Sequence, residues 1–283
     1  MFGFLNVYKP AGITSHDVVA RLRRVTKVKQ IGHTGTLDPF AEGVLPICIG
    51  KATRLIEYLN DDKAYVGTVK LGNSTTTYDI EGEGVNFSDK TVTLNEIETA
   101  LEKFRGDIEQ IPPIYSAIKV NGKKLYEYAR EGKEVKIEPR KVNINKLEVV
   151  DFKPELRQVS LHIECSKGTY IRSIANDLGE ELGTYGHLVK LVRVKAGDFG
   201  INEAIKLNDL DTIEAVQKNL IYPLDKLDFP KYELNEKEKA VISNGGSIRA
   251  DVKDSIVCLT FQGVLCAAAK ASEGVLRCEK VFL

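Results

Sequence analysis

Apolar and polar residues recur at strand and helix spacings along most of residues 1–200. Residues 64–71 alternate between apolar and polar side chains, which predicts a half-buried strand. Residues 44–50 form a continuous apolar run, which is typical of a strand buried on both faces. Three further strands are predicted at residues 3–9, 156–165 and 187–197.

Helical spacing marks four other segments. Thr14 and Asp17 form a capping-box pattern before a helix that turns Val18, Leu22 and Val25 inward. A short helix is predicted at residues 52–59, and another at residues 95–105, which we expect Pro112 and Pro113 to end. The fourth helix carries its apolar side chains at Ile171, Ile174, Ala175, Leu178 and Leu182.

Strands with scattered helices and no regular βαβ alternation predict an α+β fold built on a mixed α/β sheet. Residues 114–140 are irregular and basic, and so long an excursion from a sheet is typically functional or disordered. Pro223 and Pro230 bracket a polar stretch that we interpret as a linker. The short strands predicted beyond it give two domains, residues 1–230 and a small β-rich domain at residues 231–283.

Charge is balanced overall but not locally. The chain has 283 residues, with 40 basic and 40 acidic side chains, so its net charge indicates no partner. Residues 9–30 and residues 114–146 each carry a net charge of +5, whereas residues 201–240 carry −3. Basic zones of this kind bind polyanions such as RNA, although a solvated charged face is the alternative interpretation.

Several classes of protein are disfavoured by the remaining composition. The five cysteines are isolated and the four histidines lack metal-ligand spacing, so we expect neither a disulfide framework nor a metal site. Six residues separate Gly43 from Gly50, whereas a Walker A loop requires four. With no membrane-spanning run and no signal peptide, we expect a cytoplasmic protein with reduced cysteines.

The segment GHTGTLDPFAEGVL presents Asp38 between glycines and Pro39. Proline keeps the preceding residue out of the helical region, so Asp38 is expected in an extended or turn conformation. The glycines permit unusual backbone angles and close approach of another chain. An Asx-type turn, in which Asp38 caps its own backbone, is the alternative to an acid displayed for chemistry.

The other parts suit work on RNA. A nearby arginine, for which Arg172 is the candidate, would keep a carboxylate such as Asp38 ionised and oriented. Tyr65 and Tyr170 offer faces for stacking a base, and His33 lies on the glycine-rich loop, where it could enter a helix stack.

Five motifs together resemble the TruB family of bacterial tRNA pseudouridine-55 synthases. The motifs are YKPAGITS, GHTGTLDPFAEGVLPICIGKATR, KAYVGTVKLG, IPPIYSAIKVNGKKLYEYAREG and CSKGTYIRSIANDLGEELG. They recur in order over residues 4–200, and the last 50 or so residues resemble a short, reduced PUA-type RNA-binding domain. The resemblance implies a catalytic domain with a mainly antiparallel mixed sheet, flanking helices and a thumb-like insertion at residues 114–140 that clamps RNA.

Carried over to this chain, the resemblance implies a role for each motif residue. Asp38 would be the catalytic nucleophile, paired with Arg172. The flipped uracil would stack on Tyr65, Tyr170 would contact the base or sugar, and Leu191 would form an apolar wall. His33 would fill the space that the base leaves in the T-loop. Lys123 and Lys124 of the insertion would contact phosphates.

The implied reaction isomerises uridine 55 of tRNA to pseudouridine without a metal or an organic cofactor. We expect the T-arm of tRNA as partner, no membrane association, no obligate protein partner and a monomer. Asp38 would attack either C6 of the base or C1′ of the sugar, and both mechanisms stay open. Two rival functions also stay open: a related synthase acting on another RNA, as guide-dependent members do, and an RNA-binding or RNA-folding protein.

Each assignment has a structural alternative. Tyr65 and Leu191 could be ordinary core residues, and His33 could bond a loop carbonyl. Arg172 could pair with Asp177 or Glu180, and Lys9 could serve only the fold.

Overall fold

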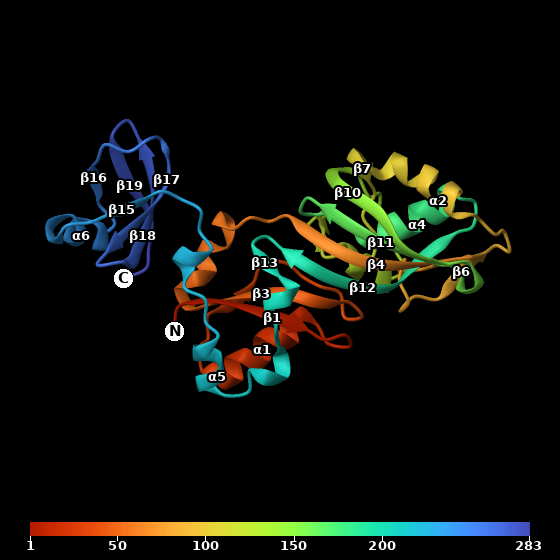
Figure 1. Ribbon diagram of the computed structural model, residues 1–283, viewed down its shortest axis with the longest axis horizontal. Helices are drawn as coiled ribbons and strands as arrows, with labels where there is room; N and C mark the ends of the chain where they lie inside the picture. Colours follow the sequence, from red (N-terminus) through yellow and green to blue (C-terminus); the bar gives the residue numbers. More distant parts are fainter.

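The computed structural model describes residues 1–283 and contains two large sheets joined by a connection near residue 230 (Figure 1). The larger sheet has ten strands, which are β1 Gly3–Lys9, β2 Ile31–His33, β3 Glu42–Ile49, β4 Lys63–Leu71, β7 Gly106–Gln110, β10 Arg140–Lys153, β11 Gln158–Cys165, β12 Gly186–Ala196, β13 Phe199–Gly200 and β14 Ile205–Lys206. Eight of them follow the order β14-β1-β3-β12-β4-β11-β10-β7. Only the pairs β1–β14 and β3–β12 are parallel, so the predicted mixed, mainly antiparallel sheet is confirmed.

Six α-helices accompany the sheets: α1 Ser15–Thr26, α2 Leu94–Leu101, α3 Leu125–Arg130, α4 Ile171–Glu181, α5 Ile213–Lys218 and α6 Glu236–Ser243. Short 3₁₀ segments are η1 Gly50–Tyr58, η2 Glu102–Phe104, η3 Pro154–Leu156, η4 Ile201–Glu203, η5 Leu207–Asp209 and η6 Pro223–Asp225. Helices α1 and α5 lie beside the half of the sheet around β1 and β3, whereas α2 and α4 lie beside the half around β10 and β11 (Figure 1).

Two small ribbons lie outside the main sheet. Strand β5 (Asn73–Thr75) pairs with β6 (Gly84–Phe87), and β8 (Lys119–Val120) pairs with β9 (Lys123–Lys124). The second pair, together with α3, forms the regular part of the predicted insertion at residues 114–140.

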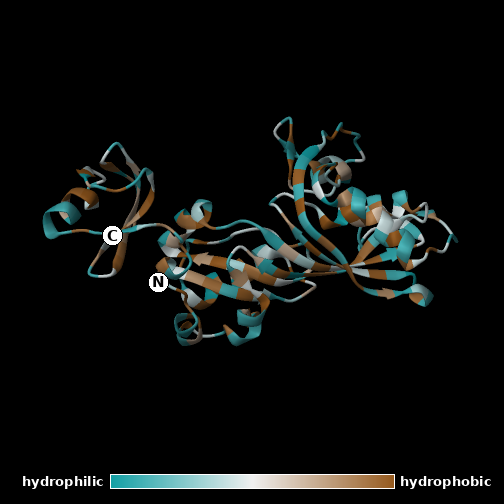
Figure 2. Cartoon of the chain, turned by 45° about the horizontal axis from the view of Figure 1, so that its top comes forward, coloured by the Kyte–Doolittle hydropathy of each residue, from teal (hydrophilic) through white to brown (hydrophobic).

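Local sequence signals account for the elements that were predicted. Helix α1 begins at a complete capping box between Thr14 and Asp17 and buries Val18 and Leu22, as expected. The strands predicted around residues 44–50, 64–71 and 187–197 are confirmed as β3, β4 and β12. Bands of apolar and polar colour follow one another along strands of the main sheet (Figure 2). In β4 buried and half-buried residues alternate from Tyr65 to Leu71, because one face packs on the core, whereas β3 is buried on both faces, as predicted.

Two helix predictions need correction. The segment predicted at residues 95–105 is helical only to Phe104, because Gly106 adopts φ +76° and opens strand β7. Pro112 and Pro113 lie beyond that strand, so the prediction that they end the helix is wrong. The helix predicted at residues 52–59 is the 3₁₀ segment η1.

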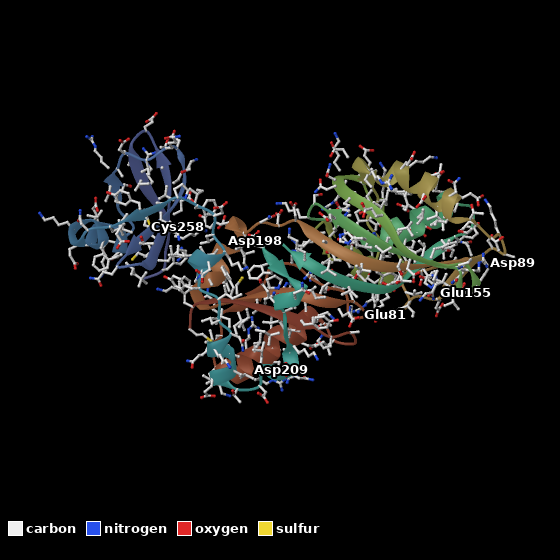
Figure 3. The ribbon with its side chains drawn as sticks, in the orientation of Figure 1. Glu81, Asp89, Glu155, Asp198, Asp209 and Cys258 are labelled. Atoms are coloured by element: carbon white, nitrogen blue, oxygen red, sulfur yellow. The ribbon has the colours of Figure 1, made fainter.

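The second sheet follows the linker and has the order β15-β17-β18-β19-β16. Its strands are β15 Lys231–Glu233, β16 Ser247–Arg249, β17 Ser255–Phe261, β18 Val264–Ser272 and β19 Val275–Val281, which confirms a small β-rich C-terminal part. Figure 3 shows Cys258 within this sheet and Asp198 beside the connection, where Lys226 Nζ donates to the Asp198 carbonyl at 2.8 Å.

Two apolar clusters form the core of the main sheet and the contact between the two large sheets. A cluster of 33 buried residues runs along the face of the main sheet that α1 and α4 cover, and it includes Leu5, Leu22, Ile163 and Ile174. A second cluster joins the opposite face of β1 and β3 to the second sheet through Phe4, Val44, Cys258 and Phe282, among others. The two sheets therefore share a core.

Candidate active site

A cavity of about 720 Å³ lies on the α4 face of the main sheet. The loop that follows β2, strands β4 and β12, the first turn of α4 and the start of the insertion all contribute to its walls. Among the side chains that line it are Asp38, Tyr65, Tyr170, Arg172 and Leu191. Five of the residues singled out in the sequence therefore come together in one place.

The loop that carries Asp38 is held at several points. Ser15 Oγ donates to the Leu37 carbonyl at 3.1 Å and accepts from the Leu37 N–H at 2.8 Å. The Ala41 N–H donates to the Asp38 carbonyl at 3.1 Å, which closes a turn across Pro39. These bonds fix the backbone on both sides of Asp38, so its carboxylate is presented from a rigid loop.

Lys9 supports the same loop from beneath. Its fully buried ammonium donates to the carbonyls of Pro10 at 2.9 Å, Ile13 at 2.7 Å and Pro39 at 3.2 Å. Burial lowers the pKa of Lys9 to about 8, against the opposing attraction of Asp38. These contacts favour the alternative in which Lys9 serves the fold of the site.

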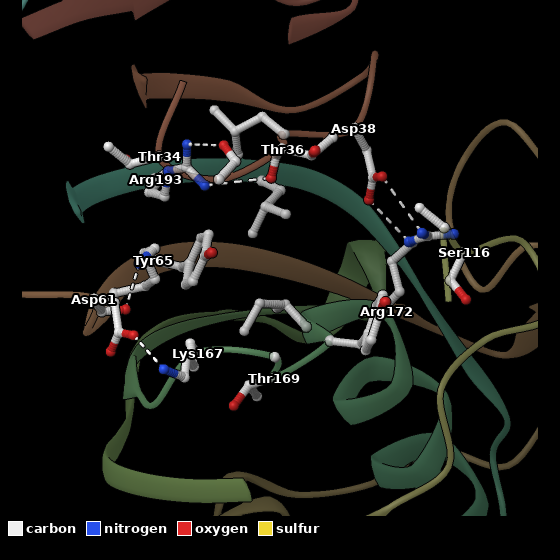
Figure 4. A pocket seen from close by; sticks show the side chains of 18 of the residues that line it. Thr34, Thr36, Asp38, Asp61, Tyr65, Ser116, Lys167, Thr169, Arg172 and Arg193 are labelled. Atoms are coloured by element: carbon white, nitrogen blue, oxygen red, sulfur yellow. Dashed lines mark hydrogen bonds and ion pairs between the residues drawn. The ribbon is translucent and has the colours of Figure 1, made fainter. Parts of the chain in front are cut away.

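Arg172 holds the Asp38 carboxylate with two donors. Arg172 Nε lies 2.9 Å from Asp38 Oδ2, and Nη2 lies 3.4 Å from Oδ1 (Figure 4). The guanidinium also reaches Asp79 Oδ2 at 3.3 Å, rather than Asp177 or Glu180. Both oxygens of Asp38 therefore face an arginine, which differs from an Asx turn, where they would cap the local backbone.

Two opposing influences determine the ionisation of Asp38. Removal from bulk water raises the pKa of Asp38, and the positive charge of Arg172 lowers it. Burial prevails, so the pKa of Asp38 lies above its ordinary value, although 34% of its side-chain surface is exposed. Arg172 thus moderates a shift that burial would otherwise make larger.

Tyr65 and Leu191 supply the floor of the cavity from neighbouring strands. Leu191 pairs with Gly67 of β4, two residues beyond Tyr65, so both side chains emerge on the same face. Tyr65 is 8% exposed and Leu191 is 5% exposed. Burial raises the pKa of the Tyr65 phenol, and the nearby Arg193 charge acts against that change.

Arg193 is a site residue that the sequence analysis missed. It is 1% exposed, and it donates to the carbonyls of Val44 at 2.7 Å, Gly35 at 3.0 Å and Thr36 at 3.3 Å (Figure 4). Arg193 follows Leu191 by two residues on the same strand, so both side chains lie on the face toward the cavity, and this spacing could have identified Arg193 from the sequence. Gly43 packs against its backbone, where a Cβ would lie 2.3 Å from the Arg193 carbonyl oxygen. Gly43 also adopts φ +108°, which confirms the expectation that it permits an unusual backbone angle, and the segment that approaches it closely is strand β12 of the same chain.

The remaining predicted residues lie outside this cavity. His33 ends strand β2 and is half-buried, with Nδ1 buried and unpaired, and burial together with the Arg193 charge lowers its pKa. Lys123 and Lys124 belong to the β8–β9 ribbon of the insertion. Lys123 pairs with Glu131, and Lys124 lies over the Tyr126 ring, 5.4 Å from its centroid.

No group of three or more His, Cys, Asp or Glu side chains is arranged to hold a metal ion. None of the helices has both the length and the apolar surface required to cross a membrane.

Comparison with known protein families shows to which family the chain belongs. Residues 23–171 match the N-terminal domain of the TruB family pseudouridylate synthases, and residues 172–227 match the C-terminal domain of tRNA pseudouridylate synthase B. The chain belongs to the TruB family.

Whole-chain relatives agree with this placement. The TruB-family chain is 46% identical to the tRNA pseudouridine synthase B of Clostridium novyi, over 86% of this chain and 81% of the relative. It is 40% identical to the protein of the same name from Streptococcus mutans, over 99% of both chains.

Solved structures show the same fold. A chain from a Cbf5-Nop10-Gar1 complex matches with a TM-score of 0.74 at 27% identity, covering 100% of this chain and 85% of that one. A chain from an H/ACA RNP bound to a substrate RNA containing 2′-deoxyuridine matches with a TM-score of 0.73 at 25% identity, with the same coverage. The TruB-family chain therefore has the pseudouridine-synthase architecture in both its sheets.

Proposed function

We propose that this TruB-family protein is a tRNA pseudouridine synthase that isomerises uridine 55 in the T-loop. The observation that carries the proposal is the Asp38 carboxylate, held by two donors of Arg172 at the wall of the cavity. Relatives that cover most of the chain at 40–48% identity are named tRNA pseudouridine synthase B, which supports tRNA as the substrate.

The reaction requires the uridine to leave the RNA stack. Extrusion costs on the order of a few kcal/mol, which contacts in a pocket must offset. A volume of about 720 Å³ falls within the roughly 300–1,000 Å³ typical of ligand sites and leaves room for a nucleotide. In this proposal the base stacks on Tyr65, Leu191 forms an apolar wall and Tyr170 contacts the base or sugar.

Asp38 is the proposed nucleophile. The bond between N1 and C1′ breaks, the uracil turns, and a bond between C5 and C1′ forms. The proton on C5 is released, and N1 becomes protonated, so atoms and charge balance. The carboxylate attacks either C6 of the base or C1′ of the sugar, and Arg172 orients it in either case.

The RNA would extend beyond the cavity. We propose that residues 1–230 form the catalytic domain, that the insertion at residues 114–140 clamps the T-arm, and that residues 231–283 contact the rest of the tRNA. Lys123 and Lys124 would meet phosphates, and His33 would occupy the space that the flipped base leaves. The basic composition of the insertion supports this arrangement.

The likeness to Cbf5 favours one rival: a synthase that acts on another RNA with the help of a guide or protein partners. The insertion favours a protein that grips its substrate unassisted. Purified protein incubated with T-arm RNA alone distinguishes the two, because a guide-dependent enzyme would leave that RNA unmodified.

Tritium release tests the proposal. An unmodified T-arm stem-loop labelled with [5-³H]uridine is incubated with the wild-type protein and with Asp38→Asn. The control is Asp211→Asn, which changes an exposed aspartate that does not line the cavity. We expect release by wild type and the control and none by Asp38→Asn. Tight binding without release by wild type would leave an RNA-binding or RNA-folding role instead.

A further inference from the structure

The insertion at residues 114–140 joins the main sheet beside α4, the helix that carries Arg172. Gln110 ends β7 and pairs with Arg140 at the start of β10, so this pair closes the base of the loop formed by residues 111–139. Gln110 is 3% exposed, which is unusual for a polar side chain at the root of a long excursion. Its surroundings account for the burial.

The Gln110 amide grips the peptide units on both sides of Tyr170. Nε2 of Gln110 donates to the Tyr170 carbonyl at 3.0 Å, and its Oε1 accepts from the Tyr170 N–H at 2.7 Å. Tyr170 is the N-cap residue of α4 and has no side-chain cap of its own. Gln110 thus fixes the start of the helix that carries Arg172 two residues later.

Two further bonds join the same segments. Ser173 Oγ donates to the Ile111 carbonyl at 2.9 Å, and Arg172 Nη2 donates to the Tyr115 carbonyl at 3.0 Å. The Tyr126 N–H of α3 donates to the carbonyl of Ser116 at 3.1 Å. A continuous set of contacts therefore runs from α3 in the insertion through residues 110–116 to Arg172 and Asp38.

We propose that Gln110 is a positioning residue that couples the grip of the insertion on RNA to the alignment of Arg172 with Asp38. The inference rests on the proposed function, since it concerns the same site. An RNA that pulls on α3 moves residues 110–116, and these carry the Tyr170 peptide and the acceptor of Arg172 Nη2. A displacement of about 1 Å at a reacting group costs on the order of 100-fold in rate.

Glutamine suits this task because its amide presents a donor and an acceptor at once. An ionised glutamate keeps the acceptor and loses the donor. Leucine loses both and leaves the Tyr170 N–H without its partner. Gln110→Glu and Gln110→Leu therefore form a graded series at nearly constant volume.

The control is Asn143→Leu. Asn143 lies on β10, opposite Asp107 of β7, and its Nδ2 donates to Asp107 Oδ1 at 2.7 Å. The substitution removes a side-chain hydrogen bond between the same two strands, and the Asn143 side chain makes no hydrogen bond to α4. Thermal unfolding of each variant checks that the fold is retained.

Binding and chemistry are measured separately on the T-arm stem-loop, as the Kd and the single-turnover rate of tritium release. For Gln110→Leu we expect a rate ~10–100-fold lower with Kd within about threefold of wild type. Gln110→Glu should lie between, and Asn143→Leu should resemble wild type.

The pH profile of the single-turnover rate distinguishes positioning from general damage. Charged or titratable groups near Asp38 are Arg172 on α4, Lys9 on β1, Tyr65 on β4, and Asp79 and Glu81 after β5. A looser Arg172 lowers the pKa of Asp38 less, so the acid limb of Gln110→Leu should move to higher pH.

Rates within twofold of wild type in both Gln110 variants would overturn the inference. So would a parallel loss of rate and affinity, or an acid limb unmoved from that of wild type. If Gln110→Leu does not fold, Gln110→Glu decides by the same measurements. A wild-type protein that releases no tritium would instead overturn the proposed function, which separates the two failures.

Discussion

At the scale of single residues, two side chains hold the main chain of the site in the same way. Ser15 donates to and accepts from Leu37 on the Asp38 loop, and Gln110 does so with Tyr170 at the start of α4. Each fixes the backbone one or two residues away from a member of the Asp38–Arg172 pair. Two neutral side chains therefore help to set the geometry of that pair, together with the charged Lys9 and Asp79.

A pH dependence follows from the Asp38 environment. Burial raises the pKa of Asp38. If the reaction requires the ionised carboxylate, its rate is highest above that pKa and falls as the pH drops through it. This loss of rate is expected at a higher pH than it would be for an exposed aspartate. Arg172→Met removes the charge that lowers this pKa, so the acid limb should move further up. We also expect a ~10–100-fold loss of rate at neutral pH, for hydrogen bonds to a charge worth about 1.5–3 kcal/mol.

The rate of tritium release measured across pH checks this prediction. Arg24→Met, on the exposed side of α1, is the matched control. An acid limb that stays in place in Arg172→Met would contradict the assigned role of the ion pair.

Lys9→Met tests the support beneath the loop. Three backbone carbonyls lose a donor, of which the Pro39 carbonyl keeps the Gly12 N–H at 2.8 Å. Each of the two unsatisfied polar groups that remain costs about 1–3 kcal/mol, so we expect the free energy of unfolding to fall by ~2–6 kcal/mol. Urea unfolding measures the change, with exposed Lys29→Met as control. A loss below about 0.5 kcal/mol would mean that solvent or other donors replace Lys9.

At this scale the sequence predicted the residues that face the cavity better than those that hold them. Asp38 and Arg172 belong to motifs with distinctive glycine, proline and tyrosine neighbours. Gln110 and Arg193 lie in strands, where polar residues are ordinarily read as solvent-facing, and only the tertiary contacts show that they are buried.

At the scale of elements, several lysines of the insertion are paired with carboxylates, so fewer of them are free to bind RNA than its composition indicates. Glu131 pairs with both Lys123 and Lys133, and Lys136 pairs with Glu138. Lys124 has no carboxylate partner and lies beside Tyr126, 3.4 Å from its hydroxyl. Lys124 is therefore freer than Lys123 to meet a phosphate.

Salt dependence of tRNA binding checks this difference. A lost phosphate contact reduces the slope of log K against log[salt] by about 0.7–0.9. We expect Lys124→Gln to flatten the slope by this amount and Lys123→Gln to flatten it less. Lys218→Gln, exposed on α5, serves as control. Unchanged slopes in both ribbon variants would remove these lysines from the interface.

Most elements with strong local signals were predicted, and those that depend on neighbours were not. The capping box of α1 and the alternation of β4 identify those elements without tertiary information. Strand β10 was missed because most of its residues are polar and only Val142, Ile144 and Leu147 are buried, so its apolar positions do not alternate along the strand. Helix α6 was missed although Asn235 and Glu238 form a capping box.

At the scale of the whole molecule, the shared apolar cluster joins the two sheets. Phe282 follows β19 and stacks on Phe2 at 5.5 Å between ring centroids, while Lys280 pairs with Glu57 of η1 at 2.8 Å. Residues 231–283 are therefore packed on the part of the chain that forms the main sheet, rather than tethered to it.

We expect calorimetry of the wild-type chain to show one cooperative unfolding transition. Phe282→Ala removes a side chain that is 8% exposed, and a buried Phe→Ala change costs about 3–5 kcal/mol, so the transition should broaden or divide in two. Val264→Ala, at an exposed position of β18, should leave it single. Two transitions in wild type would show that the cluster does not couple the sheets.

The strand order of the main sheet has a consequence for how the chain is made. Strand β1, which precedes the other strands of this sheet in the chain, lies between β3 and β14, and β14 is translated about 200 residues later. Strand β12 must likewise arrive before β3 and β4 can be joined. Contacts so distant in sequence slow folding, and unpaired edges stay exposed until they form. A nascent chain therefore lacks the cavity that holds Asp38 for most of translation, and we expect its amino-terminal half to depend on chaperones until β12 leaves the ribosome.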